Sequence, residues 1–421
     1  MRLDKNQLIQ NFLEVRRETQ CLCDPLEIED YGVQPMEDAS PPKWHLAHTT
    51  WFFEVFVLKP HVEKYVGFNE QYKYLFNSYY DGVGERYPRS ARGNLSRPTV
   101  AEVMEYRSYV DQKMEEILLA GPSEEIERLV ILGLEHEKQH QELILTDLKF
   151  NLGHNPLRPA YRNNLIPPQS DCSESNLDFI VLDGGMKKTG VFSREVDFCF
   201  DNETPKHRVW IDEFAIASRL VTNGEYLHFI EEEGYKKPTL WLSEGWSSVQ
   251  NEHWEAPEYW YKKGDVWFEY TLGGGKELDL NLPVTHVSFY EADAFARWSG
   301  ARLPTEFEWE AVASTRMIEI NEANLMNSDR FHPESAKNVT DISQLFGDCW
   351  EWTSSNYRPY PGYKALEGTL GEYNGKFMSN QMVLRGGSCV TSNNHIRDTY
   401  RNFFYPADRW QFSGIRLAKD V

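Results

Sequence analysis

The chain has 421 residues, more than one compact core usually holds, so two domains are expected. Its formal net charge of −21 argues against a surface for nucleic acid or anionic membrane, because such surfaces need clustered Lys and Arg. Hydrophobic residues make up 41% of the chain, and no apolar run is long enough to span a membrane. The N-terminal residues lack the apolar core of a signal peptide and the six cysteines are scattered, which predicts a cytoplasmic protein with reduced thiols.

The N-terminal part of the chain predicts four helices. The first runs from about Asp4 to Cys21, and the second begins after Ser40-Pro41-Pro42, where a polar residue followed by prolines suits a first turn. A third spans roughly Thr99 to Leu119, and a fourth begins near Ser123 with acidic residues in its first turns. Four such helices predict a bundle, whose core is a usual place for metal ligands.

The fourth predicted helix carries His136-Glu137-Lys138-Gln139-His140. Histidines four residues apart lie one helical turn apart on nearly the same side, so both imidazoles can bind one metal ion. The alternative is a pair of core histidines with other partners. Zinc peptidases share this spacing and use the glutamate, here Glu137, as a base. The second helix offers a third ligand, and its residues alone do not decide between His45 and His48.

Outside the predicted helices, three regions of the chain differ in composition. The long segment 68–98 contains many aromatic residues, and loops of this length are usually functional or disordered. Residues 155–176, rich in Pro, Asn and Ser, are interpreted as a linker between a helical domain, 1–154, and a second domain, 177–421. In this second domain tryptophans and glycines are frequent, so we expect irregular backbone organised by aromatic packing, with short helices near 222–232 and 289–298.

The second domain contains short motifs that resemble a known family in their order. They are Phe179-Ile180 with Gly184-Gly185, Asn202 to His207, Val221 to Tyr226, Pro283 to Ser288, Arg302 to Glu310, Gly347 to Thr353, Leu384 to Ser388 and Gly414 to Ala418. This set resembles the formylglycine-generating-enzyme domain, which has a C-type-lectin-like fold. The N-terminal half is similar to DinB-like metal-binding bundles. The combination resembles the nonhaem iron sulfoxide synthases of ergothioneine and ovothiol biosynthesis.

This resemblance implies an α+β chain, in which a DinB-like four-helix bundle is followed by a C-type-lectin-like domain with little regular structure. It also implies an Fe(II) site held by His48, in Leu46-Ala47-His48, together with His136 and His140. Three imidazoles on one face leave three positions of an octahedral ferrous ion open for a thiolate, an imidazole nitrogen and dioxygen. Glu137 would then be structural, since no further His or Glu follows at the usual peptidase spacing.

Two pairs of residues in the segment 68–98 match positions with roles in this family. The resemblance implies that Tyr79 and Tyr80 are catalytic, because a phenol near the iron can deliver a proton and steer the reaction towards C–S bond formation. Aromatic packing of the loop is the alternative. Arg89 and Arg92 are candidate clamps for the carboxylate of the thiol substrate, because guanidinium groups bind carboxylates bidentately. Exposed loop arginines could equally be solvated.

Candidate contacts to the histidine-type substrate come from both domains. Gln139 and Asn402 match positions that orient this substrate through their amides. The family branch that uses γ-glutamylcysteine has Trp-Asp where this chain has Phe403-Phe404, so the acid that would meet the glutamyl ammonium is missing and the resemblance implies the cysteine-using branch. The two aromatic rings could also attract a quaternary ammonium, or simply pack in the core.

The reaction implied by the resemblance joins the imidazole C2 of hercynine (Nα-trimethylhistidine) to cysteine, with dioxygen as oxidant. Other donors (γ-glutamylcysteine or a selenium compound), the histidine of ovothiol synthesis and a zinc hydrolase stay open. Ovothiol enzymes usually carry a C-terminal methyltransferase domain, whereas this chain ends at Val421. A copper site of the formylglycine-generating type is not expected, because no cysteine follows Cys389. The expected partners are these small molecules, without nucleic acid or membrane, and a homo-oligomer is compatible with the sequence.

Overall fold

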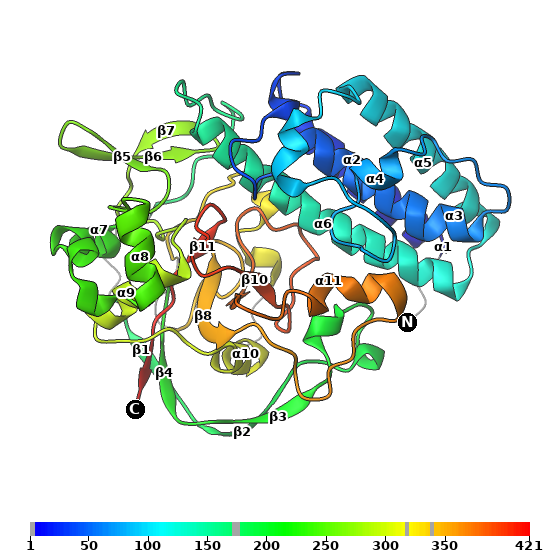
Figure 1. Ribbon diagram of the computed structural model, residues 1–421. Coiled ribbons are helices and arrows are strands. Elements are labelled where there is room, and N and C mark those ends of the chain that lie inside the picture. Colours follow the sequence, from blue (N-terminus) through cyan, green and yellow to red (C-terminus); the bar gives the residue numbers. More distant parts are fainter. Residues whose placement is uncertain (1–4, 171–176, 316–319, 337–340) are drawn as a thin grey trace. The chain divides into compact units, whose positions relative to one another are not determined.

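The computed structural model describes residues 5–170, 177–315, 320–336 and 341–421 (Figure 1). The chain divides into two compact units. The helical unit comprises Met1–Tyr161 and Leu366–Tyr373, and the C-terminal unit comprises Arg162–Ala365 and Asn374–Val421. Residues 171–176 of the predicted linker, and Asp4 at the predicted start of the first helix, lie outside the described residues. No helix within the described ranges is both long and apolar enough to cross a membrane.

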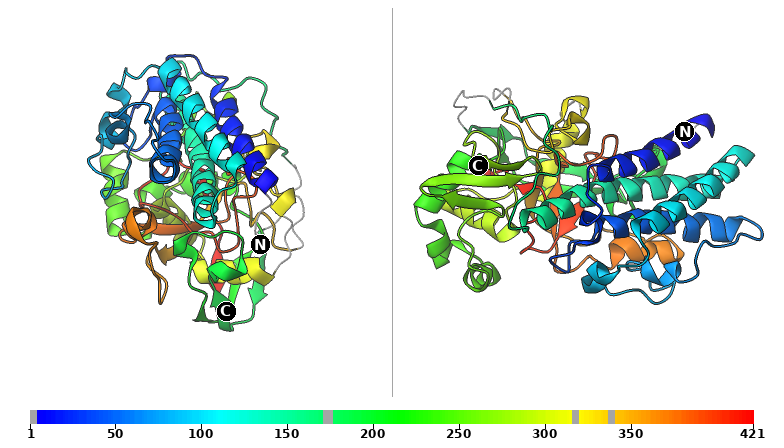
Figure 2. Two further views of the ribbon diagram at one scale, coloured as in Figure 1. Left: turned by 90° about the vertical axis from the view of Figure 1, so that its right-hand side faces the viewer. Right: turned by 90° about the horizontal axis from the view of Figure 1, so that it is seen from above.

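Four long helices run side by side in the helical unit (Figures 1 and 2). They are α1 (Lys5–Cys23), α2 (Pro42–Phe53), α5 (Val100–Ala120) and α6 (Glu124–Gly153). Helix α1 packs on α6, and α2 packs on both α5 and α6. Two shorter α-helices are α3 (Lys59–His61) and α4 (Tyr72–Leu75). The four helices expected from the sequence are confirmed. The segment 68–98 contains little regular structure.

Local sequence explains where these helices begin. Helix α2 has Pro42 in its first turn, where the missing N–H costs no hydrogen bond. Helix α5 has a capping box, in which the Thr99 hydroxyl accepts from the Glu102 N–H and the Glu102 carboxylate accepts from the Thr99 N–H. Every residue of α2 is buried, and the helix continues as a π-helical turn, η2 (Glu54–Leu58), a form that is frequent at functional sites.

Helices α2 and α6 approach each other closely at Gly133. A Cβ atom at this position would lie 2.6 Å from the Phe53 ring and 2.8 Å from the Phe52 ring, so the close approach needs glycine. His136 and His140 follow Gly133 on the next two turns of α6. The approach at Gly133 therefore brings these two histidines close to α2, which carries His48.

The C-terminal unit contains small sheets rather than one large one. Their strand orders are β1-β4-β12, β10-β9-β8-β11, β5-β6-β7 and the ribbon β2-β3, and among the strands that the structure describes only the β8–β11 pair is parallel. The strands are β1 (Phe179–Leu182), β2 (Gly185–Thr189), β3 (His207–Ile211), β4 (Phe214–Ala217), β5 (Trp260–Lys263), β6 (Val266–Thr271), β7 (Gly274–Glu277), β8 (Trp350–Asn356), β9 (Met382–Arg385), β10 (Asn402–Phe404), β11 (Ser413–Gly414) and β12 (Ala418–Asp420). The α+β class expected from the sequence is confirmed.

Short helices connect these strands. They are α7 (Asn223–Glu231), α8 (Ser243–Asn251), α9 (Phe289–Trp298), α10 (Glu306–Thr315) and α11 (Glu372–Gly375). Helices α7 and α9 were expected from the sequence. Helices α8, α10 and α11 were not predicted, because helices this short depend on tertiary packing more than on their own propensity.

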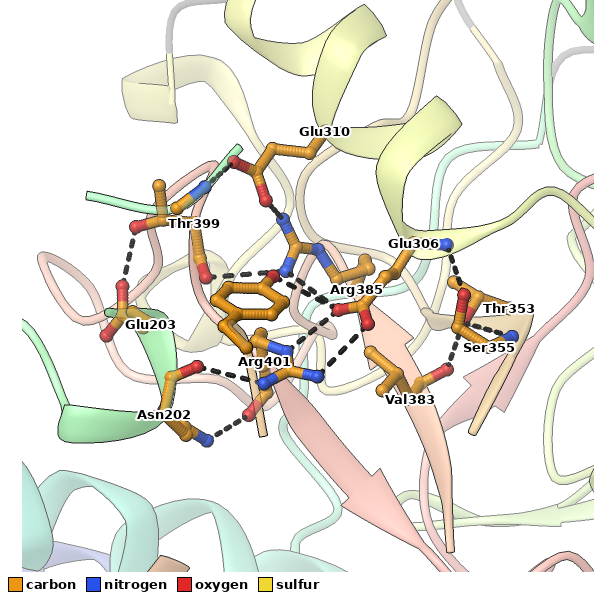
Figure 3. Close-up of polar contacts among 12 residues, drawn as sticks. Asn202, Glu203, Glu306, Glu310, Thr353, Ser355, Val383, Arg385, Thr399 and Arg401 are labelled. Atoms are coloured by element: carbon orange, nitrogen blue, oxygen red, sulfur yellow. Dashed lines mark hydrogen bonds and ion pairs between the residues drawn. The ribbon is translucent and has the colours of Figure 1, made fainter. Parts of the chain in front are cut away.

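The core of the C-terminal unit is built on motifs that the sequence analysis singled out. Trp350 and Trp352 begin β8 and are almost fully buried. Arg385 of β9 lies opposite Glu351 of β8 in the strand register. It belongs to a buried polar network with Glu306, Glu310 and Arg401 (Figure 3). The charged residues of these motifs therefore bind one another in the interior of the unit.

Candidate metal centre

Three buried histidines of the helical unit form a possible metal-binding cluster. His48 lies on α2, and His136 and His140 lie on successive turns of α6. One ring nitrogen from each lies within 4.8 Å of those of the other two. These are the three residues that we proposed as ligands, and the packing of α2 on α6 is what brings them together.

The hydrogen bonds of His48 show which of its nitrogens faces the cluster. Its Nδ1 lies 2.6 Å from the carbonyl oxygen of Phe76, so this nitrogen carries the proton and donates. Its Nε2, and both ring nitrogens of His136, are buried and have no hydrogen-bond partner among the described residues. Buried polar atoms are nearly always satisfied, and a metal cation would satisfy His48 Nε2 and the one ring nitrogen of neutral His136 that holds a lone pair.

Burial also keeps the cluster in its metal-binding protonation state. It lowers the pKa of His136 to about 4, while the neighbouring Glu137 opposes this shift. The pKa of both His48 and His140 lies well below the ordinary value, first because of burial and then because His136 is close. Neutral imidazoles are the form that binds metal ions.

His45, which the sequence could not separate from His48, occupies a different position. Both of its ring nitrogens have partners: Nδ1 lies 2.8 Å from His140 Nδ1, and Nε2 lies 3.0 Å from Asp147 Oδ2. His45 is therefore not part of the ligand cluster, which contains His48 instead. Both histidines face α6, and the choice follows from their partners: His45 uses both nitrogens, whereas His48 Nε2 has no partner among the described residues.

Two arginines bind the Glu137 carboxylate, so it is not available as a general base. Its carboxylate accepts from Arg107 at 2.6 Å, Arg16 at 2.8 Å and the Thr19 hydroxyl at 2.7 Å. Burial alone would raise the pKa of Glu137, but the two guanidinium groups outweigh it and lower the pKa to about 2. An ionised carboxylate with this many donors serves as a link between helices, as expected for a structural role.

The paired tyrosines lie on a loop that is pinned by Asn77. Asn77 accepts from the Tyr80 N–H and donates to the carbonyl oxygen of Tyr80, and it is completely buried. Tyr80 stacks with Trp51, which in turn stacks with His48. The Tyr79 ring lies 5.0 Å from that of Tyr80. Burial raises the pKa of both phenols, so both keep their protons.

Tyr373 joins this aromatic group from a distant part of the sequence. Its ring stacks with that of Tyr79 at 5.2 Å and lies edge-on to His136 at 6.4 Å. Its hydroxyl donates to Gln139 Oε1 at 3.0 Å. The neighbouring Glu372 accepts from the backbone N–H groups of the tyrosine loop at Asp81 and Gly82. The sequence analysis missed Tyr373, because no local pattern marks a contact over 234 residues.

The two candidate arginines differ sharply in their surroundings. Arg92 is buried, lies 3.3 Å over the Trp44 ring and donates to the hydroxyls of Ser40 and Ser78, while its Nε has no partner within the described residues. No carboxylate in the described part of the chain pairs with it. Arg89 is half-exposed, donates to the backbone oxygen of Asp38 and lies 3.6 Å from the carboxylate of Asp38. Burial, and then Arg89, lower the pKa of Arg92.

The candidate residues of the C-terminal unit lie on β10. Asn402 Oδ1 accepts from the Phe403 N–H. The Phe403 ring stacks with Tyr357 at 4.1 Å and with Phe377 at 5.7 Å, and Phe404 packs edge-on against Trp410. For Phe403 these contacts favour the packing alternative stated from the sequence.

Comparisons with known proteins agree with this architecture. Residues 11–144 match the DinB superfamily, and residues 166–421 match the Sulfatase-modifying factor enzyme 1-like domain. The protein named "Hercynine oxygenase" from Mycolicibacterium smegmatis is 31% identical to this chain over 406 residues. The alignment covers 91% of each protein. The chain belongs to the hercynine oxygenase family.

Two further relatives support the assignment. The protein of the same name from Mycobacterium tuberculosis is 30% identical over 411 residues, with 91% of each chain covered. The "Ergothioneine biosynthesis protein 1" of Schizosaccharomyces pombe is 26% identical over 234 residues, which cover 53% of this chain and 28% of that protein. The resemblance to the ergothioneine-type sulfoxide synthases is thus confirmed at the level of the family and of both domains.

Proposed function

We propose that this chain is an iron(II)- and dioxygen-dependent sulfoxide synthase that joins the imidazole C2 of hercynine to the sulfur of cysteine. One observation carries the iron site: buried, neutral imidazole nitrogens of His48 and His136 lie close together without a hydrogen-bond partner among the described residues. Imidazole suits several transition metals, so the choice of iron rests on the family rather than on the donor atoms. Bound iron would supply the one-electron chemistry that dioxygen needs.

The proposed reaction balances without an external reductant. The C2–H bond of hercynine and the S–H bond of cysteine break, and a C–S bond forms, which is a two-electron oxidation. Oxidation of the sulfur to the sulfoxide takes two more electrons. One oxygen atom of O2 enters the sulfoxide, and the other leaves as water with the two hydrogens.

Arg92 is the residue we propose to bind the carboxylate of cysteine. A buried guanidinium that lacks an anionic partner is costly, and a substrate carboxylate would offset that cost. Trp44 supports this geometry, because its ring lies beneath Arg92 and stacks on His48 at 4.5 Å. The arginine and the ligand histidine are therefore positioned by the same indole. Arg89 stays a second candidate, with Asp38 as its present partner.

The phenols are proposed to control protons at the reacting atoms. Tyr79 and Tyr80 keep their protons because burial raises their pKa, so either can act as an acid. Tyr373 is the third phenol of the group and contacts both Tyr79 and the edge of His136. Its hydrogen bond to Gln139 orients the amide that we propose as a contact to hercynine. Asn402 and Phe404 remain candidate contacts to hercynine from the C-terminal unit, whereas the stacking of Phe403 on Tyr357 favours a packing role.

The zinc hydrolase alternative predicts a different use of Glu137. A hydrolase would need this carboxylate as a base beside the metal, but Arg16 and Arg107 bind it. Glu137→Gln should lower the free energy of unfolding by about 3–5 kcal/mol, because it leaves two buried arginines without their anion. It should leave metal binding by the folded fraction intact. Chemical denaturation and metal titration of the same preparation measure both quantities.

The reaction is tested by anaerobic reconstitution with iron(II), followed by oxygen and hercynine with either cysteine or γ-glutamylcysteine. Products are identified by mass spectrometry. We expect a hercynine–cysteine sulfoxide from the wild type, none from His136→Ala, and wild-type yield from His228→Ala, which removes an exposed histidine of α7. Cysteine sulfinate alone would contradict the synthase assignment. A product only with γ-glutamylcysteine would contradict the proposed donor.

A further inference from the structure

A buried chain of hydrogen bonds leads from the candidate metal centre to a carboxylate. His140 Nδ1 lies 2.8 Å from His45 Nδ1, and His45 Nε2 lies 3.0 Å from Asp147 Oδ2. The same Oδ2 atom accepts from the Ser40 N–H at 2.7 Å. All four residues are buried, and His45 comes from α2 whereas His140 and Asp147 come from α6.

The chemistry of these atoms fixes the direction of each hydrogen bond. A carboxylate oxygen only accepts, so His45 Nε2 carries the proton and donates to Asp147. In a neutral imidazole the other nitrogen, Nδ1, then holds a lone pair and accepts. Between two facing Nδ1 atoms one must donate, so His140 Nδ1 carries its proton. His140 Nε2 is left with the lone pair that a metal ion needs.

His48 has its proton fixed in the same way by a different group. Its Nδ1 donates to the carbonyl oxygen of Phe76 at 2.6 Å, which leaves Nε2 for the cluster. Two of the three histidines thus have an acceptor behind the ring. A backbone carbonyl provides it for His48, and the His45–Asp147 pair provides it for His140.

We infer that His45 and Asp147 are positioning residues for the metal centre: they hold His140 in the tautomer and ring orientation that present Nε2 to the metal. This inference rests on the metal site of the proposed function. Partners of this kind behind a metal-binding histidine typically change metal affinity by about 10–100-fold. His45 is therefore a residue of the metal centre without being a ligand.

The test compares three substitutions of His45 that differ in where they place an acceptor. His45→Asn carries its Oδ1 at the branch position that Nδ1 occupies in histidine, so it can still accept from His140. His45→Gln places its oxygen one bond further out, towards Asp147, and His45→Leu has no acceptor. The affinity for iron(II) is measured anaerobically by competition with a chromogenic chelator, and the visible absorption of bound cobalt(II) reports ligand geometry. Circular dichroism checks the fold.

We expect His45→Asn to keep iron(II) affinity within about threefold of wild type, and His45→Gln and His45→Leu to lose about 10–100-fold with an altered cobalt spectrum. Asp147→Asn retains an acceptor oxygen and should resemble His45→Asn. Equal affinity and equal spectra in all three His45 variants would overturn the inference, as would His45→Asn binding as weakly as His45→Leu. If His45→Leu fails to fold, the Asn and Gln pair decides. Metal binding by wild type but not by His136→Ala upholds the site itself, whatever the His45 variants do.

Discussion

Arg401 in the C-terminal unit and Arg92 in the helical unit are both buried arginines that lie over an aromatic ring. Arg401 lies 4.0 Å over Tyr360, and Arg92 lies 3.3 Å over Trp44. Arg401 binds Glu306 through two nitrogens at 2.8 and 3.0 Å, whereas Arg92 pairs with no carboxylate of the described chain. Burial acts against both cations, but Glu306 raises the pKa of Arg401 while the pKa of Arg92 stays low.

Buried histidines show the same contrast. In the C-terminal unit, His332 contacts Glu269 at 3.1 Å and a backbone oxygen at 3.0 Å, so both of its nitrogens are used. In the helical unit, both nitrogens of His136 have no hydrogen-bond partner among the described residues. A buried polar group without a partner calls for an explanation, and a metal ion provides one for imidazole nitrogens that lie close together.

Replacing Arg401 should have the largest effect on stability. Arg401→Met removes the cation that binds the buried carboxylate of Glu306 through two nitrogens and leaves Arg385 at 3.9 Å, so we expect the free energy of unfolding to fall by about 3–5 kcal/mol. Denaturant titration measures this change, and Arg358→Met, at an exposed position, is the matched control. Equal stability of the two variants would mean that the pair contributes nothing to the fold.

Asp348 extends the comparison to buried acids. Burial raises the pKa of Asp348 to about 6, although the Asn324 amide donates a hydrogen bond to its carboxylate. In contrast, the arginines around Glu137 lower the pKa of Glu137 to about 2. A raised pKa means that the protonated form favours the folded state, so this contribution is present below pH 3.8 and is lost as the pH rises through 6. The loss amounts to about 3 kcal/mol.

Asp348→Asn should remove that dependence on pH. The difference in free energy of unfolding between wild type and variant should shift by about 2 kcal/mol in favour of the variant between pH 4 and pH 7. Denaturant titrations at both values measure it. A constant difference would show that Asp348 titrates in the ordinary range.

Replacing Arg92 should have the smallest effect on stability and a clear effect on substrate binding. Arg92→Met removes a buried cation that has no carboxylate partner, so we expect the free energy of unfolding to change by less than about 1 kcal/mol. Loss of a charged hydrogen bond to cysteine should raise its KM about 10–100-fold. Steady-state kinetics at varied cysteine concentration measure this, with Arg89→Met in parallel. A large loss of stability in Arg92→Met would assign Arg92 to the fold instead.

The bundle and the two ligands of α6 were predictable because the patterns that mark them are local. Helical periodicity and caps such as Thr99 and Ser123 act within a few residues, and a spacing of four places His136 and His140 on one face of a helix. Short helices of the C-terminal unit, such as α8 (Ser243–Asn251), were missed because their stability comes from packing with distant segments.

The sequence by itself determined the family, the two-domain α+β architecture and a histidine pair that suits a metal, because motif order and helical spacing are properties of the chain. The spacing of the residues left His45 and His48 open, and the family resemblance implied His48. The tertiary structure decided their roles, because it places His48 in the cluster while His45 bonds His140 and Asp147. It also decided that Arg92 is buried and that Tyr373 contacts Gln139. Burial and long-range contacts arise from packing, which no local pattern encodes.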